Sequence, residues 1–324
     1  MLQSCVLFCI SRPADSEDGL AYATRSPQAT PASNPSARSV TESALPTKPP
    51  ANAGPAPALV QIQDLQLDVQ VIGSIHPGRP TLVFLHEGLG CIALWRAFPR
   101  QLAERTGLPA LVYSRRGYGR SQGFGEELQP GFMHDEARQV LPALLERFGV
   151  DRPVLVGHSD GASIALIYAA YAAAPADRLP IAPLAVIAMA PHLFVEPVTV
   201  ESIAAIAARF EASDLPRRLG RYHDDPARTF GHWTRAWLSP EFLTWNIEAQ
   251  VAQIRCPVLA IQGDADEYGT MQQVRRIAEL VSHSRVMEID DCGHSPFVDQ
   301  AQAVLDAIIE FLQAAAISPV RAAP

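Results

Sequence analysis

The sequence contains few cysteines, and their positions indicate no site. The five cysteines are odd in number and scattered: Cys5, Cys9, Cys91, Cys256 and Cys292. That spacing matches neither a zinc site nor a disulfide framework, so a reducing compartment is the simpler interpretation. Long apolar runs are also missing, because no stretch reaches the roughly 18 residues needed to span a bilayer. We therefore expect a cytoplasmic protein without a metal site or a membrane partner.

Positive charge is also scarce. The chain has 26 Lys and Arg against 34 Asp and Glu, a net charge of −8, and no long basic cluster. This balance disfavours nucleic acid and anionic membranes as partners. The rest of the composition, 48% hydrophobic and 19% charged over 324 residues, allows one large α/β domain with a small insertion. The composition does not indicate an oligomeric state.

Large apolar residues are sparse near the N-terminus. Residues 26–57 are mostly Pro, Ala, Ser, Thr and Asn, and such a segment cannot bury enough surface to offset its ordering entropy. We interpret residues 1–57 as a disordered tail or as an over-extended start of the reading frame. The apolar run 6–10 has no basic residue before it and is shorter than a usual secretory signal. The folded domain is therefore expected at 58–324.

From residue 59 onward, apolar patterns predict strands alternating with helices. Alternation of apolar and polar residues over 59–73 indicates two antiparallel strands at a sheet edge. Further strands are predicted at 81–85, 108–113, 153–156, 184–189, 257–261 and 286–289. Helices are predicted at 94–106 with a kink at Pro99, and at 133–148, 162–174, 271–281 and 300–315. This order predicts an α/β fold, a mostly parallel, doubly wound sheet with helices on both faces.

One turn between a predicted strand and a predicted helix has a reactive pattern. Residues 157–161 read Gly-His-Ser-Asp-Gly, which matches G-x-S-x-G, the nucleophile elbow. The chain must reverse from strand to helix within a few residues, which places Ser159 in a strained, exposed position. A Cβ at Gly157 or Gly161 would collide with the neighbouring strand or helix.

A serine hydroxyl becomes a nucleophile only when a histidine base, held by a carboxylate, removes its proton. Candidate partners follow the elbow, each after a predicted strand. Asp264, Asp266 and Glu267 are the candidate acids, and His294 is the candidate base. The carboxyl ends of parallel strands meet at one edge of a sheet, so we expect these groups to converge there.

Five segments, in order and each at a predicted strand end, resemble the α/β-hydrolase superfamily over about residues 59–315. They are His86-Glu87-Gly88-Leu89-Gly90, Arg116-Gly117-Tyr118-Gly119-Arg120-Ser121, Gly157-His158-Ser159-Asp160-Gly161, Gly263-Asp264-Ala265-Asp266 and Gly293-His294. The resemblance implies an α/β-hydrolase fold with Ser159 as nucleophile, Asp266 as orienting acid and His294 as base. Asp264 and Glu267 stay as alternative acids.

The resemblance also implies an oxyanion hole made of two backbone N–H groups. One belongs to Asp160, the residue after the nucleophile. The other belongs to Gly88, with Leu89 as the alternative. His86 matches a strand-end histidine that organises this loop, and His158 is expected to be structural.

The alternation of strands and helices lapses between about residues 192 and 255, and this insertion resembles the family's helical cap. It contains three of the four tryptophans. We expect an apolar pocket over Ser159, lined by Leu89, Phe194, Trp233, Trp237 and Tyr268, with Tyr222 and Trp245 as further wall residues. The alternative is that the tryptophans pack the cap's own small core.

Two acids depart from the common family pattern. Glu87 stands where glycine is frequent, and Asp160 where an apolar residue is frequent. Asp160 would begin a helix, whose dipole favours a carboxylate, and Glu87 could pair with Arg115 or Arg116. Alternatively, both acids make the pocket unfavourable for anionic substrates, which predicts a preference for neutral or cationic esters.

Together these features predict a cofactor-free serine hydrolase of small carboxylic esters or lactones that acts through an acyl-enzyme. Serine at the elbow disfavours dehalogenation and epoxide hydrolysis, for which family members use aspartate. The alternatives are hydrolysis of a carbon–carbon bond in ring-cleavage diketones, perhydrolysis, and a non-catalytic ligand-binding protein on the same scaffold. The cap sets specificity, so one sequence does not identify the substrate.

Overall fold

The computed structural model of the chain describes residues 56–123, 129–174 and 179–318. Nearly all of the N-terminal segment predicted to be disordered, residues 1–55, lies outside the described residues. No helix within the described ranges is both long enough and apolar enough to cross a membrane.

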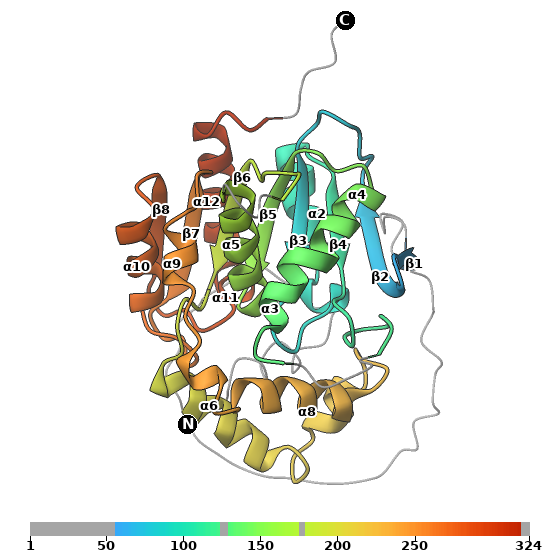
Figure 1. Ribbon diagram of the computed structural model, residues 1–324, viewed down its shortest axis with the longest axis vertical. Coiled ribbons are helices and arrows are strands. Elements are labelled where there is room, and N and C mark those ends of the chain that lie inside the picture. The colour runs from blue at the N-terminus through green and yellow to red at the C-terminus, as the bar shows by residue number, and fades with distance from the viewer. Residues whose placement is uncertain (1–55, 124–128, 175–178, 319–324) are drawn as a thin grey trace, which may run out of the picture. The chain divides into compact units, whose positions relative to one another are not determined.

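A single eight-stranded sheet organises the described residues, in the order β1-β2-β4-β3-β5-β6-β7-β8 (Figure 1). The strands are β1 (Ala58–Ile62), β2 (Leu65–Ile72), β3 (Thr81–Leu85), β4 (Ala110–Tyr113), β5 (Pro153–His158), β6 (Ala185–Met189), β7 (Val258–Gly263) and β8 (Ser284–Ile289). β2 pairs antiparallel with β1 and β4, and all other pairs are parallel. The predicted doubly wound sheet with two antiparallel edge strands is confirmed.

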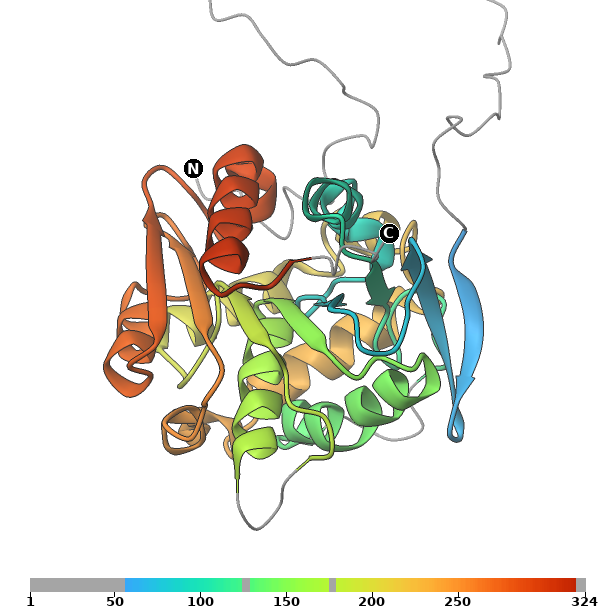
Figure 2. The ribbon, with the colours of Figure 1, turned by 90° about the horizontal axis from the view of Figure 1, so that it is seen from above.

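Helices cover both faces of the sheet because its central strands are apolar on both sides. β3 and β5 are fully buried, as expected for strands between two helical layers. On one face lie α2 (Phe98–Thr106), α11 (Pro296–Asp299) and α12 (Ala301–Ala314); on the other lie α3 (Phe132–Asp135), η2 (Glu136–Val140), α4 (Leu141–Arg147), α5 (Asp160–Ala173), α9 (Glu248–Val251) and α10 (Gln272–Leu280). Figure 2 shows α2 in teal and α12 in red opposite the green helices α4 and α5.

The predicted kink at Pro99 is wrong. The chain forms a short 3₁₀ turn, η1 (Ile92–Trp95), and α2 then begins at Phe98 with Pro99 in its first turn. Proline is tolerated there because the first N–H groups of a helix have no partner within the helix. Pro99 therefore marks a helix start.

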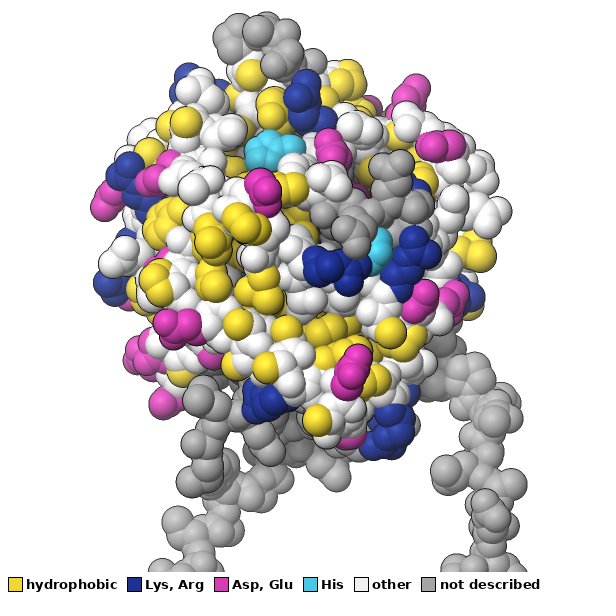
Figure 3. Space-filling model, turned by 60° about the horizontal axis from the view of Figure 1, so that its bottom comes forward, with side chains coloured by type: hydrophobic (Ala, Val, Ile, Leu, Met, Phe, Trp, Pro, Cys, Tyr) yellow, Lys and Arg dark blue, Asp and Glu magenta, His cyan; other side chains and the backbone are white. Residues whose placement is uncertain are grey.

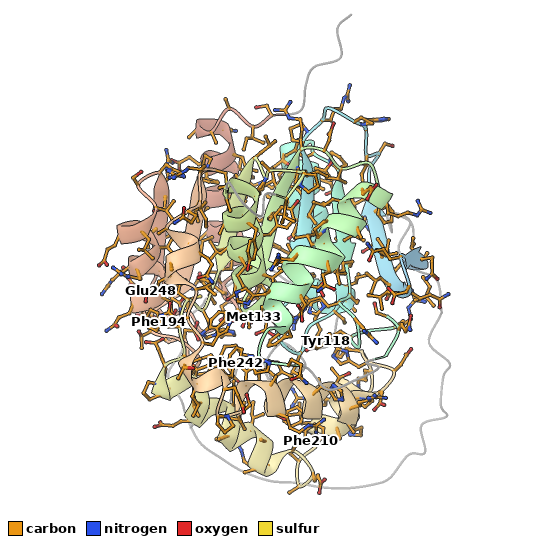
Figure 4. The ribbon with its side chains drawn as sticks, viewed as in Figure 1. Tyr118, Met133, Phe194, Phe210, Phe242 and Glu248 are labelled. Atoms are coloured by element: carbon orange, nitrogen blue, oxygen red, sulfur yellow. The ribbon has the colours of Figure 1, made fainter. Side chains whose placement is uncertain are left out.

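Between β6 and β7 the chain forms α6 (Pro197–Arg209), α7 (Leu215–Leu219), α8 (Pro226–Trp237) and η3 (Phe242–Thr244). We call these four elements the cap. In Figure 1, α6 and α8 lie beyond the lower edge of the sheet. The rings of Phe210 and Phe230 stack at 3.8 Å between these two helices, and Phe242 packs at 4.7 Å from Trp237. Figure 4 labels Phe210 and Phe242. The cap therefore has a small aromatic core of its own.

Candidate active site

Ser159 lies in a strained turn between β5 and α5. Its φ is 52° and its ψ −120°, a left-handed conformation that costs a residue with a Cβ roughly 1–3 kcal/mol. A Cβ on Gly157 would collide with the backbone of Ala162, and one on Gly161 with the carbonyl groups of Leu85 and His86. The predicted need for both glycines is confirmed. The turn thus holds Ser159 at the carboxyl end of β5, as a nucleophile elbow requires.

His294 and Asp266 are hydrogen-bonded to each other. The Nδ1 of His294 lies 2.8 Å and 2.9 Å from the two carboxylate oxygens of Asp266. Asp266 also accepts hydrogen bonds from the Gln262 side-chain amide at 2.7 Å and from the Tyr268 backbone N–H at 2.8 Å. These contacts fix the carboxylate, which in turn holds the proton of His294 on Nδ1. Nε2 is then the nitrogen able to accept a proton.

The other two candidate acids are placed differently. Asp264 is exposed, and its carboxylate lies 3.4 Å from the backbone N–H of Cys292, so it closes the turn after β7. Glu267 is half-buried, and its charge raises the pKa of His294 less than the charge and hydrogen bond of Asp266 do. The structure therefore favours Asp266 as the partner of His294.

Burial and Asp266 act in opposite directions on His294. Burial lowers the pKa of His294, but the charge and hydrogen bond of Asp266 outweigh it and raise the pKa from 6.5 to about 9. Conversely, the charge and hydrogen bond of His294 overcome the effect of burial and hold the pKa of Asp266 below 3.8. The pair is thus most stable as imidazolium and carboxylate.

This coupling predicts the pH dependence of catalysis. Only neutral His294 can accept a proton, so kcat/KM should fall as the pH drops below the raised pKa of His294. We expect the acidic limb of the pH profile to have its midpoint above 6.5, displaced toward 9. The measurement is kcat/KM for a neutral ester across the acidic to alkaline range. A midpoint at or below 6.5 would contradict the prediction.

The loop after β3 carries the proposed oxyanion donor Gly88. His86 fixes this loop: its Nδ1–H donates to the carbonyl of Glu87 at 2.7 Å, and its Nε2 accepts the backbone N–H of Arg115 at 2.9 Å. His86 is therefore an organising residue, as predicted. Asp160 is the first residue of α5, and the first N–H groups of a helix have no partner within it. Its N–H can therefore serve as the second donor.

Glu87 pairs with His158, and the predicted pairing of its side chain with Arg115 or Arg116 is wrong. The Glu87 carboxylate lies 3.4 Å from His158 Nδ1, while His158 Nε2–H donates to the carbonyl of His294 at 2.7 Å. Burial raises the pKa of Glu87, but the hydrogen bond and charge of His158 lower it to about 2. Through this pair the loop after β3 is connected to the elbow, which carries His158, and to the backbone of His294.

Asp160 forms a buried ion pair. Its carboxylate lies 3.4 Å from the Arg115 guanidinium and accepts the indole N–H of Trp237 at 3.2 Å. The same guanidinium donates to the backbone carbonyl of Glu87 at 2.9 Å. Asp160 thus stands at a helix N-terminus, as predicted, and also joins the cap to the core. All three contacts join elements distant in sequence, so no local pattern indicated those of Asp160 with Arg115 and Trp237.

Ser159 and His294 line one cavity beneath the cap. Its other lining residues are Glu87, Gly88, Leu89, Asp160, His192, Thr199, Ile203, Trp233, Trp237 and Tyr268. The cavity measures about 20 Å³, far less than the roughly 300 Å³ of the smallest usual ligand pockets. From the cap side, hydrophobic side chains lie between charged ones on the surface (Figure 3).

Most predicted pocket residues line this cavity, but Phe194 does not. Leu89, Trp233, Trp237 and Tyr268 are in place. Phe194 lies instead near Glu248 (Figure 4) in a separate surface hollow, because its backbone bridges to Asn246. Tyr222 and Trp245 likewise do not line the cavity. Trp245 packs 5.3 Å from Phe242, so for this residue the cap-core alternative is correct.

Sequence reasoning missed His192 as a cavity residue. It follows β6, and its ring packs 5.0 Å from that of Trp237. Burial is the main reason that the pKa of His192 is lowered to about 3, so its ring is neutral. Its position directly after a predicted strand was the one available signal. Within the described residues, no group of three or more His, Cys, Asp or Glu could hold a metal ion.

Comparison with known proteins agrees with this fold. The sequence pattern of the alpha/beta hydrolase family matches residues 82–307. The sn-1-specific diacylglycerol lipase ABHD11 of Danio rerio is 24% identical over 260 residues, covering 72% of this chain and 78% of its own. The bifunctional esterase/perhydrolase DCH of Acinetobacter calcoaceticus is 24% identical over 240 residues, covering 64% and 83%. A thermophilic esterase from Thermogutta terrifontis superposes with a TM-score of 0.60 at 20% identity, covering 81% and 99%.

The chain belongs to the alpha/beta hydrolase family. The predicted fold and family are thereby confirmed. The protein is an enzyme of that family with esterase- and lipase-type relatives.

Proposed function

We propose that this protein is a serine hydrolase that cleaves small carboxylic esters or lactones through an acyl-enzyme intermediate. The supporting observation is that the hydrogen-bonded pair Asp266–His294 and the strained Ser159 come from three strand ends, with Ser159 and His294 lining one cavity. A protein that only binds a ligand has no need of this arrangement. The esterase activity of relatives supports the ester class.

The residues of the site can carry out each step of ester hydrolysis through an acyl-enzyme. The Ser159 oxygen bonds to the acyl carbon, its proton passes to His294 Nε2, and the carbonyl π electrons move onto oxygen. The tetrahedral intermediate collapses, and the alcohol leaves with the proton from His294. Water then attacks the acyl carbon and gives its proton to His294. The bond to the Ser159 oxygen breaks, this oxygen takes the proton back from His294, and the carboxylic acid is released. Asp266 stays ionised and stabilises the imidazolium formed in both halves.

Labelling with a fluorophosphonate tests this proposal. The probe should modify the native protein at Ser159, identified by peptide mass spectrometry. Absence of labelling in a folded sample would favour the ligand-binding alternative. Turnover of p-nitrophenyl esters of increasing acyl length, of lactones and of one ring-cleavage diketone would then identify the substrate class.

Charge in the cavity predicts selectivity between substrates. The residues that line it include the acids Glu87 and Asp160 and no Lys or Arg. When His294 is neutral, as it must be to act as the base, a carboxylate on the substrate would lose its hydration there without gaining a cationic partner. We expect p-nitrophenyl hemisuccinate to be cleaved with a kcat/KM about tenfold or more below that of p-nitrophenyl pentanoate. Faster cleavage of the hemisuccinate would exclude the prediction.

A further inference from the structure

We propose that Trp233 is a catalytic residue whose indole N–H donates a third hydrogen bond to the oxyanion, beside the backbone N–H groups of Gly88 and Asp160. This inference rests on the proposed serine-hydrolase function. It assigns to a cap residue a part in the chemistry, in addition to a place in the pocket wall.

The indole nitrogen of Trp233 is buried without a partner. The residue lies on α8 with 5% of its surface exposed. Within the described parts of the chain, Nε1 has no hydrogen-bond acceptor. A buried donor without an acceptor has lost its hydrogen bond to water without a replacement, so native proteins rarely retain one. An acceptor on a bound substrate would satisfy this donor.

The indole nitrogen of Trp233 lies against Gly88 in the loop after β3. If Gly88 carried a Cβ, its nearest neighbours would be Trp233 Nε1, Cε2 and Cδ1, with the two carbons at 2.7 Å and 2.8 Å. Nε1 is thus the ring atom nearest to this position, which places the indole nitrogen against the residue whose own N–H is the proposed donor. Trp233, Gly88 and Ser159 also line the same cavity.

Neither of the other cap tryptophans combines an indole N–H without a partner with a place in the cavity lining. The indole N–H of Trp237 already donates to the carboxylate of Asp160 at 3.2 Å. Trp245 Nε1 is buried without a partner in the described structure, as Trp233 Nε1 is, but Trp245 is outside the cavity lining. Trp245 therefore serves as a matched control.

The chemistry of the indole suits this role. When Ser159 attacks, negative charge collects on the former carbonyl oxygen, which needs donors and no acceptors. The indole N–H is a donor only. In a cavity that excludes water, removing one such donor lowers kcat about 10²- to 10³-fold. Because two backbone donors remain here, we expect a loss at the lower end of that range or below it.

Two replacements of Trp233 separate the N–H group from the ring. Trp233→Phe removes the N–H and part of the bulk, whereas benzothienylalanine at position 233 keeps the shape and replaces the N–H by sulfur. We expect both to lower kcat about 10- to 100-fold with KM within about threefold. Inhibition by a trifluoromethyl ketone, which forms a tetrahedral adduct with the serine, should weaken by the same factor. Trp245→Phe should leave kcat and inhibition unchanged.

If the Trp233 variants had a raised KM with unchanged kcat and unchanged inhibition by the trifluoromethyl ketone, the proposal would be overturned. That is the result expected of a residue that only contacts the substrate as part of the pocket wall. A benzothienylalanine variant with wild-type kcat would also overturn it. Both outcomes differ from a failure of the proposed function, in which the native enzyme itself shows no fluorophosphonate labelling at Ser159.

Discussion

Replacing Ser159 with alanine is expected to lower kcat/KM for ester hydrolysis by about 10⁴-fold or more, which is roughly 5.5 kcal/mol of transition-state stabilisation. The change removes the atom that forms the acyl-enzyme. The oxyanion donors and the cavity remain, so a small residual rate over water is expected. Alanine fits the site, because the elbow is held by Gly157 and Gly161 rather than by the serine side chain.

The measurements are steady-state kinetics and fluorophosphonate labelling, with the thermal unfolding midpoint as a check on folding. Ser163→Ala is the matched control. Ser163 is also buried on α5, but its hydroxyl donates to the carbonyl of His192 at 2.8 Å, so the Ser163→Ala protein should still be labelled. If Ser159→Ala retained more than about a tenth of the wild-type rate, Ser159 would not be the nucleophile.

Asp266→Asn is expected to lower kcat by about 10⁴-fold while leaving the fold intact. The backbone N–H of Tyr268 would hold the amide oxygen, which turns the amide NH₂ toward His294 Nδ1. That nitrogen would then have to accept a hydrogen bond, which places the imidazole proton on Nε2, where it cannot act as a base. Loss of the negative charge should also move the acidic limb of the pH profile to lower pH, since Asp266 is what raises the pKa of His294.

Asp264→Asn provides the control for this experiment. Asp264 follows the same strand and has the same side chain, but it contacts the backbone of Cys292 at 3.4 Å. Its replacement should change kcat by no more than a few-fold and leave the pH profile in place. A larger loss from Asp264→Asn than from Asp266→Asn would mean that the acid has been assigned to the wrong residue.

The order of strands and helices could be predicted because it follows from local patterns. β3 and β5 are continuous apolar runs, and β1 and β2 alternate, so periodicity distinguishes buried strands from edge strands. The helix containing Pro99 was misjudged at its start, because proline breaks a helix interior but suits its first turn. Helix boundaries depend on which N–H groups remain free, and local periodicity does not record this.

The position of the reactive residues at one edge could also be predicted. Ser159, Asp266 and His294 follow three different strands, and parallel strands place their carboxyl ends together whatever their separation in sequence. Phe194 shows the limit of that rule. It also follows a strand, β6, but lies five residues beyond it, and a backbone bridge to Asn246 carries it away from the cavity.

By itself, the sequence determined the sheet, the elbow, and the presence of Ser159, Asp266 and His294 at the carboxyl edge of the sheet. Strand periodicity and turn sterics act over a few residues, so local patterns reveal them. Tertiary structure alone decided that Glu87 pairs with His158, that Asp160 joins Arg115 to Trp237, and that the indole nitrogen of Trp233 lies against Gly88. These contacts connect segments up to 145 positions apart (233 − 88). Their partners are selected by how the cap and loops pack together, and that packing is a property of the whole fold.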